Sequence, residues 1–215
     1  MREEIIKVVN ETKIIAIVRG VYGDDALNLA RALYAGGVRL LEVTFDQKNR
    51  DNWAKTVDAI STISREMSGK LYVGAGTVTS LELLKIAKKA GATFIVSPDT
   101  NGKVIKATVK NDMVSMPGAM TPTEILAAYN FGADFVKVFP TSNLGASYIK
   151  AVRGPLNHIP MLAVGGVNEK NVGEFIAAGC SGAGVGGALT NKDIIASGEF
   201  DKITALAKEL IKNSK

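Results

Sequence analysis

The residue with the clearest potential for chemistry is Lys137, which interrupts an apolar run, DFVKVFP, at 134–140. Strand alternation places Lys137 on the same face as Phe135 and Phe139. Burial disfavours an ammonium ion, so it lowers the lysine pKa from about 10.4 and frees the amine as a nucleophile. Such a lysine is typical of Schiff-base chemistry on a carbonyl substrate. The alternative is a lysine that pairs with a buried carboxylate and only joins two strands.

A second charged residue inside an apolar run is Glu42, in LLEVT at 40–44. Strand parity groups Glu42 with Leu40 and Thr44 on one face. A buried carboxylate is costly unless it is paired or works as an acid or base. Glu42 and Lys137 therefore predict either a structural ion pair or a carboxylate that moves protons around a lysine imine.

Both residues belong to a regular alternation of β-branched runs with segments of helical apolar spacing. Helix starts are indicated by two capping boxes, Thr79 with Glu82 and Thr121 with Glu124, and glycines follow the helix ends. Eight strand–helix units in one domain, residues 1–215, predict an α/β fold, a (β/α)₈ TIM barrel. Residues 2–12 are predicted to form an extra N-terminal helix over the lower mouth. An open doubly wound sheet is the alternative. The strands are expected to begin near Ile14, Arg39, Leu71, Thr93, Met113, Asp134, Ile159 and Ser181.

In such barrels the chemistry lies at the C-terminal ends of the strands. Arg19 ends the first predicted strand and can clamp a carboxylate, although a terminal arginine is often only solvated. The glycine pairs Gly165-Gly166 and Gly186-Gly187 follow the last two strands. There, backbone N–H groups, with residues 166–168 expected to enter the next helix, predict a phosphate site. Tight turns alone are the alternative for these glycines.

Composition narrows the class of protein. Of 215 residues, 47% are hydrophobic and 22% charged, which excludes a disordered chain. No apolar run approaches the roughly 18–20 residues of a membrane span, and the charged N-terminus does not resemble a secretory signal. The single cysteine, Cys180, excludes an internal disulfide, and the single histidine, His158, excludes a multi-histidine metal site. Both are interpreted as structural, and we expect a cytoplasmic protein without metal or cofactor.

The net charge of +5 has two interpretations, a lysine-rich solvated surface or a nucleic-acid site. Lysines carry the excess between residues 70 and 110. They lie in two separate predicted helices, with few aromatic residues and no nucleic-acid-binding motif. The solvated surface is therefore favoured, and no nucleic-acid partner is expected. The lysines are at positions 70, 85, 88, 89, 103, 106 and 110.

Taken together, six motifs resemble the class I aldolase family that cleaves 2-keto-3-deoxy-6-phosphogluconate and 4-hydroxy-2-oxoglutarate. The resemblance runs from about Ile14 to Ile211. Any one motif alone is weakly specific, but the set in this order is highly specific. The motifs are LEVT (41–44), GAGT (74–77), IVSP (95–98), MPGAMTPTE (116–124), KVFP (137–140) and GGV (165–167).

The resemblance implies a barrel, commonly a homotrimer, that releases pyruvate and an aldehyde from a small 2-keto acid, usually phosphorylated. It implies that Lys137 forms the imine and that Glu42 moves protons, through a bound water. The imine is the electron sink, so the resemblance implies no metal. The implied substrate contacts are Arg19 and Thr77 to the carboxylate, Pro98 and Phe139 as walls, and Gly165, Gly166, Gly186 and Gly187 to the phosphate.

Three positions depart from the family pattern. Asp46 stands where many members have arginine, Gly187 where serine is usual, and Val164 where threonine is frequent. A valine at position 164 resembles the branch of the family that cleaves the galactonate-derived epimer, so that epimer is an alternative substrate. The competing functions are a phosphate-binding isomerase or epimerase and a non-catalytic phosphate-binding barrel.

Overall fold

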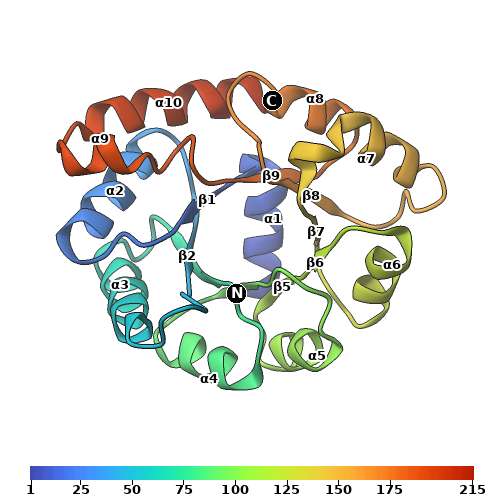
Figure 1. Ribbon diagram of the computed structural model, residues 1–215, viewed down its shortest axis with the longest axis horizontal. Coiled ribbons are helices and arrows are strands. Elements are labelled where there is room, and N and C mark those ends of the chain that lie inside the picture. The colour runs from blue at the N-terminus through green and yellow to red at the C-terminus, as the bar shows by residue number, and fades with distance from the viewer.

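The computed structural model describes residues 1–215. Nine parallel strands form one sheet in the order β5-β4-β3-β2-β1-β9-β8-β7-β6, curved into a barrel with the helices outside it except α1, which lies across its centre in this view (Figure 1). The strands are β1 (Ile14–Val18), β2 (Leu40–Thr44), β3 (Tyr72–Gly76), β4 (Phe94–Val96), β5 (Val114–Met116), β6 (Gly118–Ala119), β7 (Val136–Val138), β8 (Met161–Val164) and β9 (Gly182–Val185). The helices are α1 (Arg2–Thr12), α2 (Gly23–Ala35), α3 (Asn52–Glu66), α4 (Leu81–Lys89), α5 (Gly102–Lys110), α6 (Pro122–Asn130), the 3₁₀ helix η1 (Thr141–Asn143), α7 (Gly145–Arg153), α8 (Val172–Ala177), α9 (Lys192–Ala196) and α10 (Phe200–Asn213).

The barrel closes through a strand that is split into two pieces. β5 pairs with β4, and β6, which follows it directly, pairs with β7. Pro117 separates the two pieces because it has no N–H to donate, although its carbonyl accepts from Lys137 N at 2.8 Å. The prediction of a (β/α)₈ barrel is therefore confirmed, with its fifth strand in two parts.

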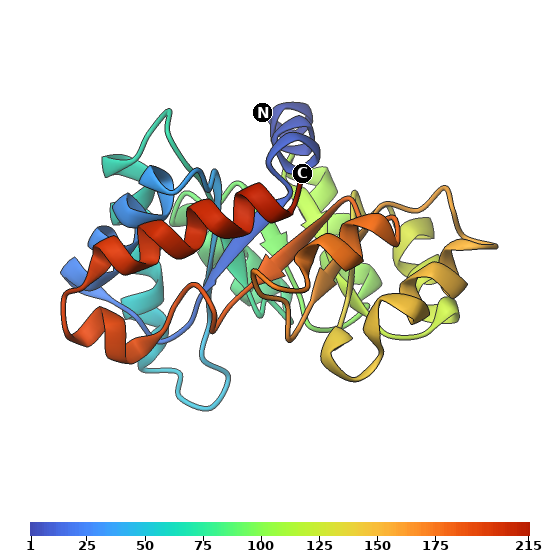
Figure 2. The ribbon, with the colours of Figure 1, turned by 90° about the horizontal axis from the view of Figure 1, so that it is seen from above.

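The N-terminal helix α1 closes one end of the barrel. Its buried Ile5 and Val9 pack with side chains from inside the barrel, among them Leu40 and Phe135. Arg2 adds an ion pair to Asp134, 2.8 Å between Nη2 and Oδ1. In Figure 2, α1 projects from one end of the molecule and the loop that follows β2 projects from the other. The predicted cover of the lower mouth is thus present, and it leaves the opposite end open.

The larger apolar cluster lies between the strands and the surrounding helices. Its members alternate along each strand with the interior residues: Leu41 and Val43 on β2, Val136 and Val138 on β7. Glu42 and Lys137 therefore point into the barrel, as strand parity predicts. No helix is long and apolar enough to cross a lipid bilayer.

One predicted helix start is confirmed and the other is wrong. Thr121 caps α6 in a complete capping box with Glu124. At α4, however, the cap is Ser80, whose hydroxyl accepts from Leu83 N at 3.2 Å, and not Thr79. The Glu82 carboxylate that the predicted box required is instead paired with Arg50.

Candidate active site

A cavity of about 840 Å³ opens at the C-terminal ends of the strands. Nineteen residues line it, including every site residue that the sequence singled out. They come from seven different segments of the chain, which only barrel closure brings together. The ten predicted residues in the lining are Arg19, Glu42, Thr77, Pro98, Lys137, Phe139, Gly165, Gly166, Gly186 and Gly187.

Lys137 sits on β7 at the base of this cavity. The residue is 8% exposed, and its Nζ lies 4.9 Å from the centre of the Phe139 ring. Burial lowers the pKa of the Lys137 ammonium; the carboxylate of Glu42 opposes this shift, and the charge of Arg19 adds to it. Burial therefore shifts the equilibrium toward the neutral amine, the form that attacks a carbonyl.

Glu42 enters the cavity from β2 and is 2% exposed. Burial raises the pKa of its carboxyl group, against the opposing charges of Lys137 and Arg19. Glu42 and Lys137 do not form an ion pair, since no nitrogen–oxygen distance of 4.0 Å or less joins their side chains. A carboxyl group with a raised pKa beside an amine with a lowered one is the arrangement of a proton donor and acceptor around a nucleophile.

Gly76 on β3 leaves the space that Glu42 occupies. A Cβ atom on Gly76 would lie 1.7 Å from Glu42 Oε1 and 2.4 Å from its Cδ. Two positions earlier on the same strand, a Cβ on Gly74 would lie 2.2 Å from the ring of Phe94 instead. Any side chain at position 76 must therefore move the Glu42 carboxylate.

We expect Gly76→Ala to lower kcat/KM by about 100-fold, because a displacement of about 1 Å in a reacting group has that effect. Gly74→Ala is the matched control: it crowds Phe94, so it lowers the melting temperature, while the folded fraction keeps its activity. Steady-state kinetics and thermal unfolding of both variants provide the comparison. A Gly76→Ala enzyme with wild-type turnover would show that the position of Glu42 is unimportant.

Thr77, immediately after Gly76, has a left-handed backbone with φ of 58°. A β-branched residue rarely adopts this conformation, which costs on the order of 1–3 kcal/mol. The Gln47 side chain supports the strained turn, since its Nε2 donates to Thr77 O at 3.0 Å. This conformation places Thr77 in the wall of the cavity.

Two glycine-containing loops, one after β8 and one after β9, also line the cavity. Six of their backbone N–H groups make no hydrogen bond within the protein. Free N–H groups that line a cavity are donors for an anion. The residues with these free groups are Gly165, Gly166, Val167, Gly186, Gly187 and Ala188.

The expectation that residues 166–168 enter a helix directly is wrong. α8 begins only at Val172, with Asn171 as its N-terminal flanking residue. The Asn171 side chain turns back, accepts from Asn168 N at 2.9 Å and donates to Gly166 O at 2.9 Å. The loop after β8 is therefore held by a side chain and not by a helix end.

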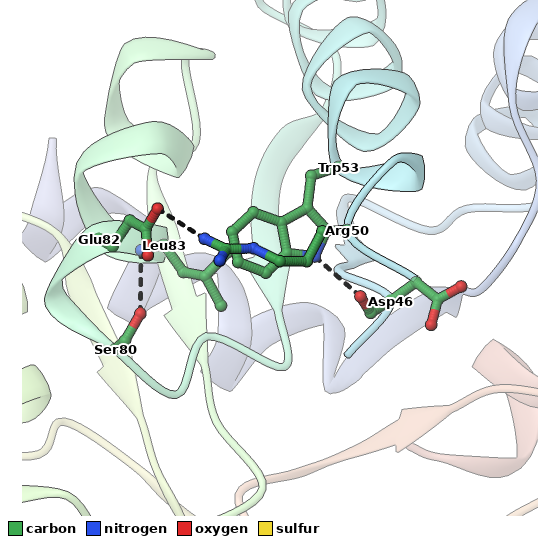
Figure 3. A network of polar contacts seen from close by, with 6 residues as sticks. All are labelled: Asp46, Arg50, Trp53, Ser80, Glu82 and Leu83. Atoms are coloured by element: carbon green, nitrogen blue, oxygen red, sulfur yellow. Dashed lines mark hydrogen bonds and ion pairs between the residues drawn. The ribbon is translucent and has the colours of Figure 1, made fainter. Parts of the chain in front are cut away.

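Asp46, at the position where arginine is frequent in the family, does not line the cavity. Its carboxylate accepts from Lys48 N and Asn52 Nδ2, each at 2.9 Å, and the Asn52 bond contributes most to a lowered pKa of Asp46. In Figure 3 the Asp46 carbonyl receives the indole N–H of Trp53, while Arg50 stacks on that indole and reaches Glu82. Asp46 thus organises the loop between β2 and α3.

Four polar residues of the cavity are not among those predicted from the sequence. Asn168, Thr190, Asn191 and Lys192 all line it. The last three follow β9 closely, so their position after a barrel strand was the available signal. Only Lys192 among them adds a charge.

Comparison with known proteins agrees with this architecture. Residues 5–206 match the model of the family described as KDPG and KHG aldolase. A 2-dehydro-3-deoxy-6-phosphogalactonate aldolase of Escherichia coli K12 is 36% identical over 82% of this chain and 83% of its own. A 2-dehydro-3-deoxy-phosphogluconate aldolase of Treponema pallidum is 33% identical over 96% of each chain.

Among solved structures, a KDPG aldolase from Legionella pneumophila is similar, with a TM-score of 0.84 and 25% identity over 95% of this chain and 97% of its own. That protein was captured with pyruvate as a covalent carbinolamine intermediate. The family match and both relatives extend over most of the chain. This chain therefore belongs to the KDPG and KHG aldolase family, whose members are carbon–carbon lyases.

Proposed function

We propose that this protein cleaves a phosphorylated 2-keto-3-deoxy-aldonate, of the phosphogluconate type, to pyruvate and glyceraldehyde 3-phosphate through a Schiff base on Lys137. 4-Hydroxy-2-oxoglutarate, which gives pyruvate and glyoxylate, is a second substrate of the same chemistry. The observation that carries the proposal is a buried amine with a lowered pKa at the base of a cavity that opens to solvent.

In the proposed reaction, the neutral amine of Lys137 attacks the C2 ketone to give a carbinolamine, which loses water to form a protonated imine. Glu42, through a bound water, takes the proton of the C4 hydroxyl group. The C3–C4 bond then breaks, its electron pair moves into the imine to form an enamine, and the aldehyde leaves. Glu42, through the same water, returns the proton to C3 of the enamine, and hydrolysis of the resulting imine releases pyruvate and restores the amine.

The remaining cavity residues are proposed to position the two anionic ends of the substrate. Arg19 and Thr77 hold the carboxylate, and Pro98 and Phe139 form the walls of the site. The phosphate accepts hydrogen bonds from free N–H groups in the loops after β8 and β9, at Gly165, Gly166, Gly186 and Gly187. These donors have no partner within the protein, which supports this assignment.

The galactonate-derived epimer is a second candidate substrate, supported by one residue of the cavity. Val164 lines the cavity, and a valine at this position resembles the branch of the family that cleaves the epimer. The Escherichia coli relative is named for the galactonate compound. The two epimers differ only at C4, the carbon whose bond breaks. An apolar side chain in place of a hydroxyl changes which orientation of the C4 hydroxyl is stabilised.

Pyruvate release from each compound tests the substrate proposal. We would supply the phosphogluconate-type acid, its galactonate epimer and 4-hydroxy-2-oxoglutarate separately and follow pyruvate with a coupled dehydrogenase. The proposal expects the highest kcat/KM with one of the two phosphorylated acids. Pyruvate from none of the three would exclude the proposed reaction.

We also propose that the single barrel domain assembles as a homotrimer in the cytoplasm. Leu126 and Tyr129 on α6, with Met120 and Phe131 beside it, are large apolar side chains left exposed on the isolated chain. We expect a native mass three times the 22.7 kDa of the chain, measured by light scattering. A monomeric mass at micromolar concentration would exclude the trimer.

A further inference from the structure

The cavity contains a cation that neither the family motifs nor the proposed mechanism uses. Lys192 is the first residue of α9 and lines the cavity. Its Nζ lies 3.6 Å from the position that a Cβ atom would take on Gly20, which follows Arg19 at the end of β1. The ammonium group makes no ion pair and no side-chain hydrogen bond in the protein. Because Lys192 is exposed and its ammonium group has no partner, that group is available to a ligand.

The backbone that carries Lys192 is fixed. The hydroxyl group of Thr190 lies 3.2 Å from the carbonyl oxygens of Ile17 and Gly186, which joins the loop after β9 to β1. The side chain of Asn191 is already engaged, since it accepts from Asp193 N at 2.9 Å and from Ile194 N at 3.3 Å. Among residues 190–192, only the side chain of Lys192 makes no hydrogen bond within the protein.

The charges of the cavity suit a substrate that is anionic at both ends. Its ionisable lining residues are three bases, Arg19, Lys137 and Lys192, and one acid, Glu42. Lys137 lies at the reacting carbon, and Arg19 is assigned to the carboxylate. Lys192 lies instead on the segment that follows Gly186 and Gly187, whose free N–H groups are donors for the distal group.

The geometry points to Lys192 as a specificity-determining residue that binds the anionic tail group of the substrate. This inference rests on the proposed function. A tail phosphate and a tail carboxylate share the chemistry that an ammonium ion recognises, and charge-assisted hydrogen bonds to either are about twice as strong as neutral ones. The tail is then selected by its charge and not by a hydroxyl group at position 187, where the chain has glycine.

Gly187 offers an independent means of testing this account. A Cβ atom at Gly187 would have no heavy atom within 4 Å, and its φ is not in the left-handed region. A serine fits there without displacing a neighbour, so Gly187→Ser adds a hydroxyl donor to the same end of the cavity. If Lys192 binds the tail, the added hydroxyl will recover part of the affinity lost in a Lys192 variant.

The experiment compares substrates that differ only in the tail. We would measure kcat/KM for the phosphorylated 2-keto-3-deoxy acid and its unphosphorylated form with wild type, Lys192→Ala and Lys192→Arg. 4-Hydroxy-2-oxoglutarate provides the carboxylate arm. Lys208→Ala is the matched control, because Lys208 is an exposed lysine of α10 outside the cavity.

In Lys192→Ala, the preference for the phosphorylated over the unphosphorylated acid should fall by about 10- to 100-fold, mainly through KM. Lys192→Arg should keep most of the wild-type preference. Gly187→Ser, added to Lys192→Ala, should restore part of the lost preference. Lys208→Ala should match wild type. A parallel loss on 4-hydroxy-2-oxoglutarate assigns Lys192 to either anion; its absence assigns Lys192 to phosphate.

An unchanged preference in Lys192→Ala would overturn the role of Lys192. So would a loss of kcat/KM on the unphosphorylated acid equal to the loss on the phosphorylated one. Failure of the proposed function is distinguishable, because the wild-type protein would then release no pyruvate from any of these compounds.

Discussion

Lys137→Ala should lower kcat/KM by about four to six orders of magnitude, the usual consequence of removing a covalent nucleophile. Without the amine no imine forms, and the electrons of the C3–C4 bond have no acceptor. The measurement is pyruvate release from the best substrate. Wild-type protein, diluted until it gives the same rate as the variant, shows how small a trace of wild-type enzyme would account for any residual activity. Retention of wild-type cleavage would exclude the lysine mechanism.

Lys137→Met separates catalysis from folding in the same experiment. Methionine fills a similar volume without a charge, so it removes the cost of burying an amine that has no ion-pair partner. We expect a melting temperature equal to or above that of wild type, together with the loss of turnover. A large drop in melting temperature would instead support a structural ion pair between Lys137 and Glu42.

Glu42→Gln should lower kcat by about 10²- to 10⁴-fold, the usual contribution of a general acid or base, with a much smaller change in KM. Glutamine keeps the volume that Gly76 accommodates, but it cannot take a proton. Deuterium exchange into the methyl group of pyruvate, followed by NMR, isolates the step, because exchange requires the enamine and not the aldehyde. Exchange at the wild-type rate would assign the proton transfer to another group.

The same variant has a second, directional effect on the pH profile of imine formation. The carboxylate of Glu42 raises the pKa of Lys137 and the charge of Arg19 lowers it. Glu42→Gln should therefore move the acid limb to lower pH, and Arg19→Gln should move it to higher pH. In wild type the limb should lie below the ordinary lysine value, because burial is the largest cause of the shift. Shifts in the same direction in both variants would contradict this account.

Strand periodicity was sufficient to predict the base of the site. Because alternate residues of a barrel strand face the interior, the positions of Glu42 and Lys137 followed from their apolar neighbours alone. The contact between Glu42 and Gly76 could not be predicted in this way. Glu42 is in register with Gly74, so the side chain leans along the strand direction by two residues, which only the structure shows.

The loops were predicted less well, because side-chain hydrogen bonds determine their paths. The amide group of Asn171 delays the start of α8, and the hydroxyl group of Ser80, not Thr79, begins α4. The position of Lys192 after a barrel strand was a signal for the site, but nothing in the sequence specifies that Thr190 joins this loop to β1. Asp46 likewise acts in its own loop, a role that its substitution for arginine did not indicate.

The central claim is that Lys137 forms an imine with a keto acid. Incubation of the folded protein with excess pyruvate and borohydride reduces any imine to a stable secondary amine, which intact mass and peptide mapping then locate. We predict one adduct per chain, on Lys137, and none in Lys137→Ala. No adduct on the folded protein, or an adduct on a different lysine, would contradict the mechanism.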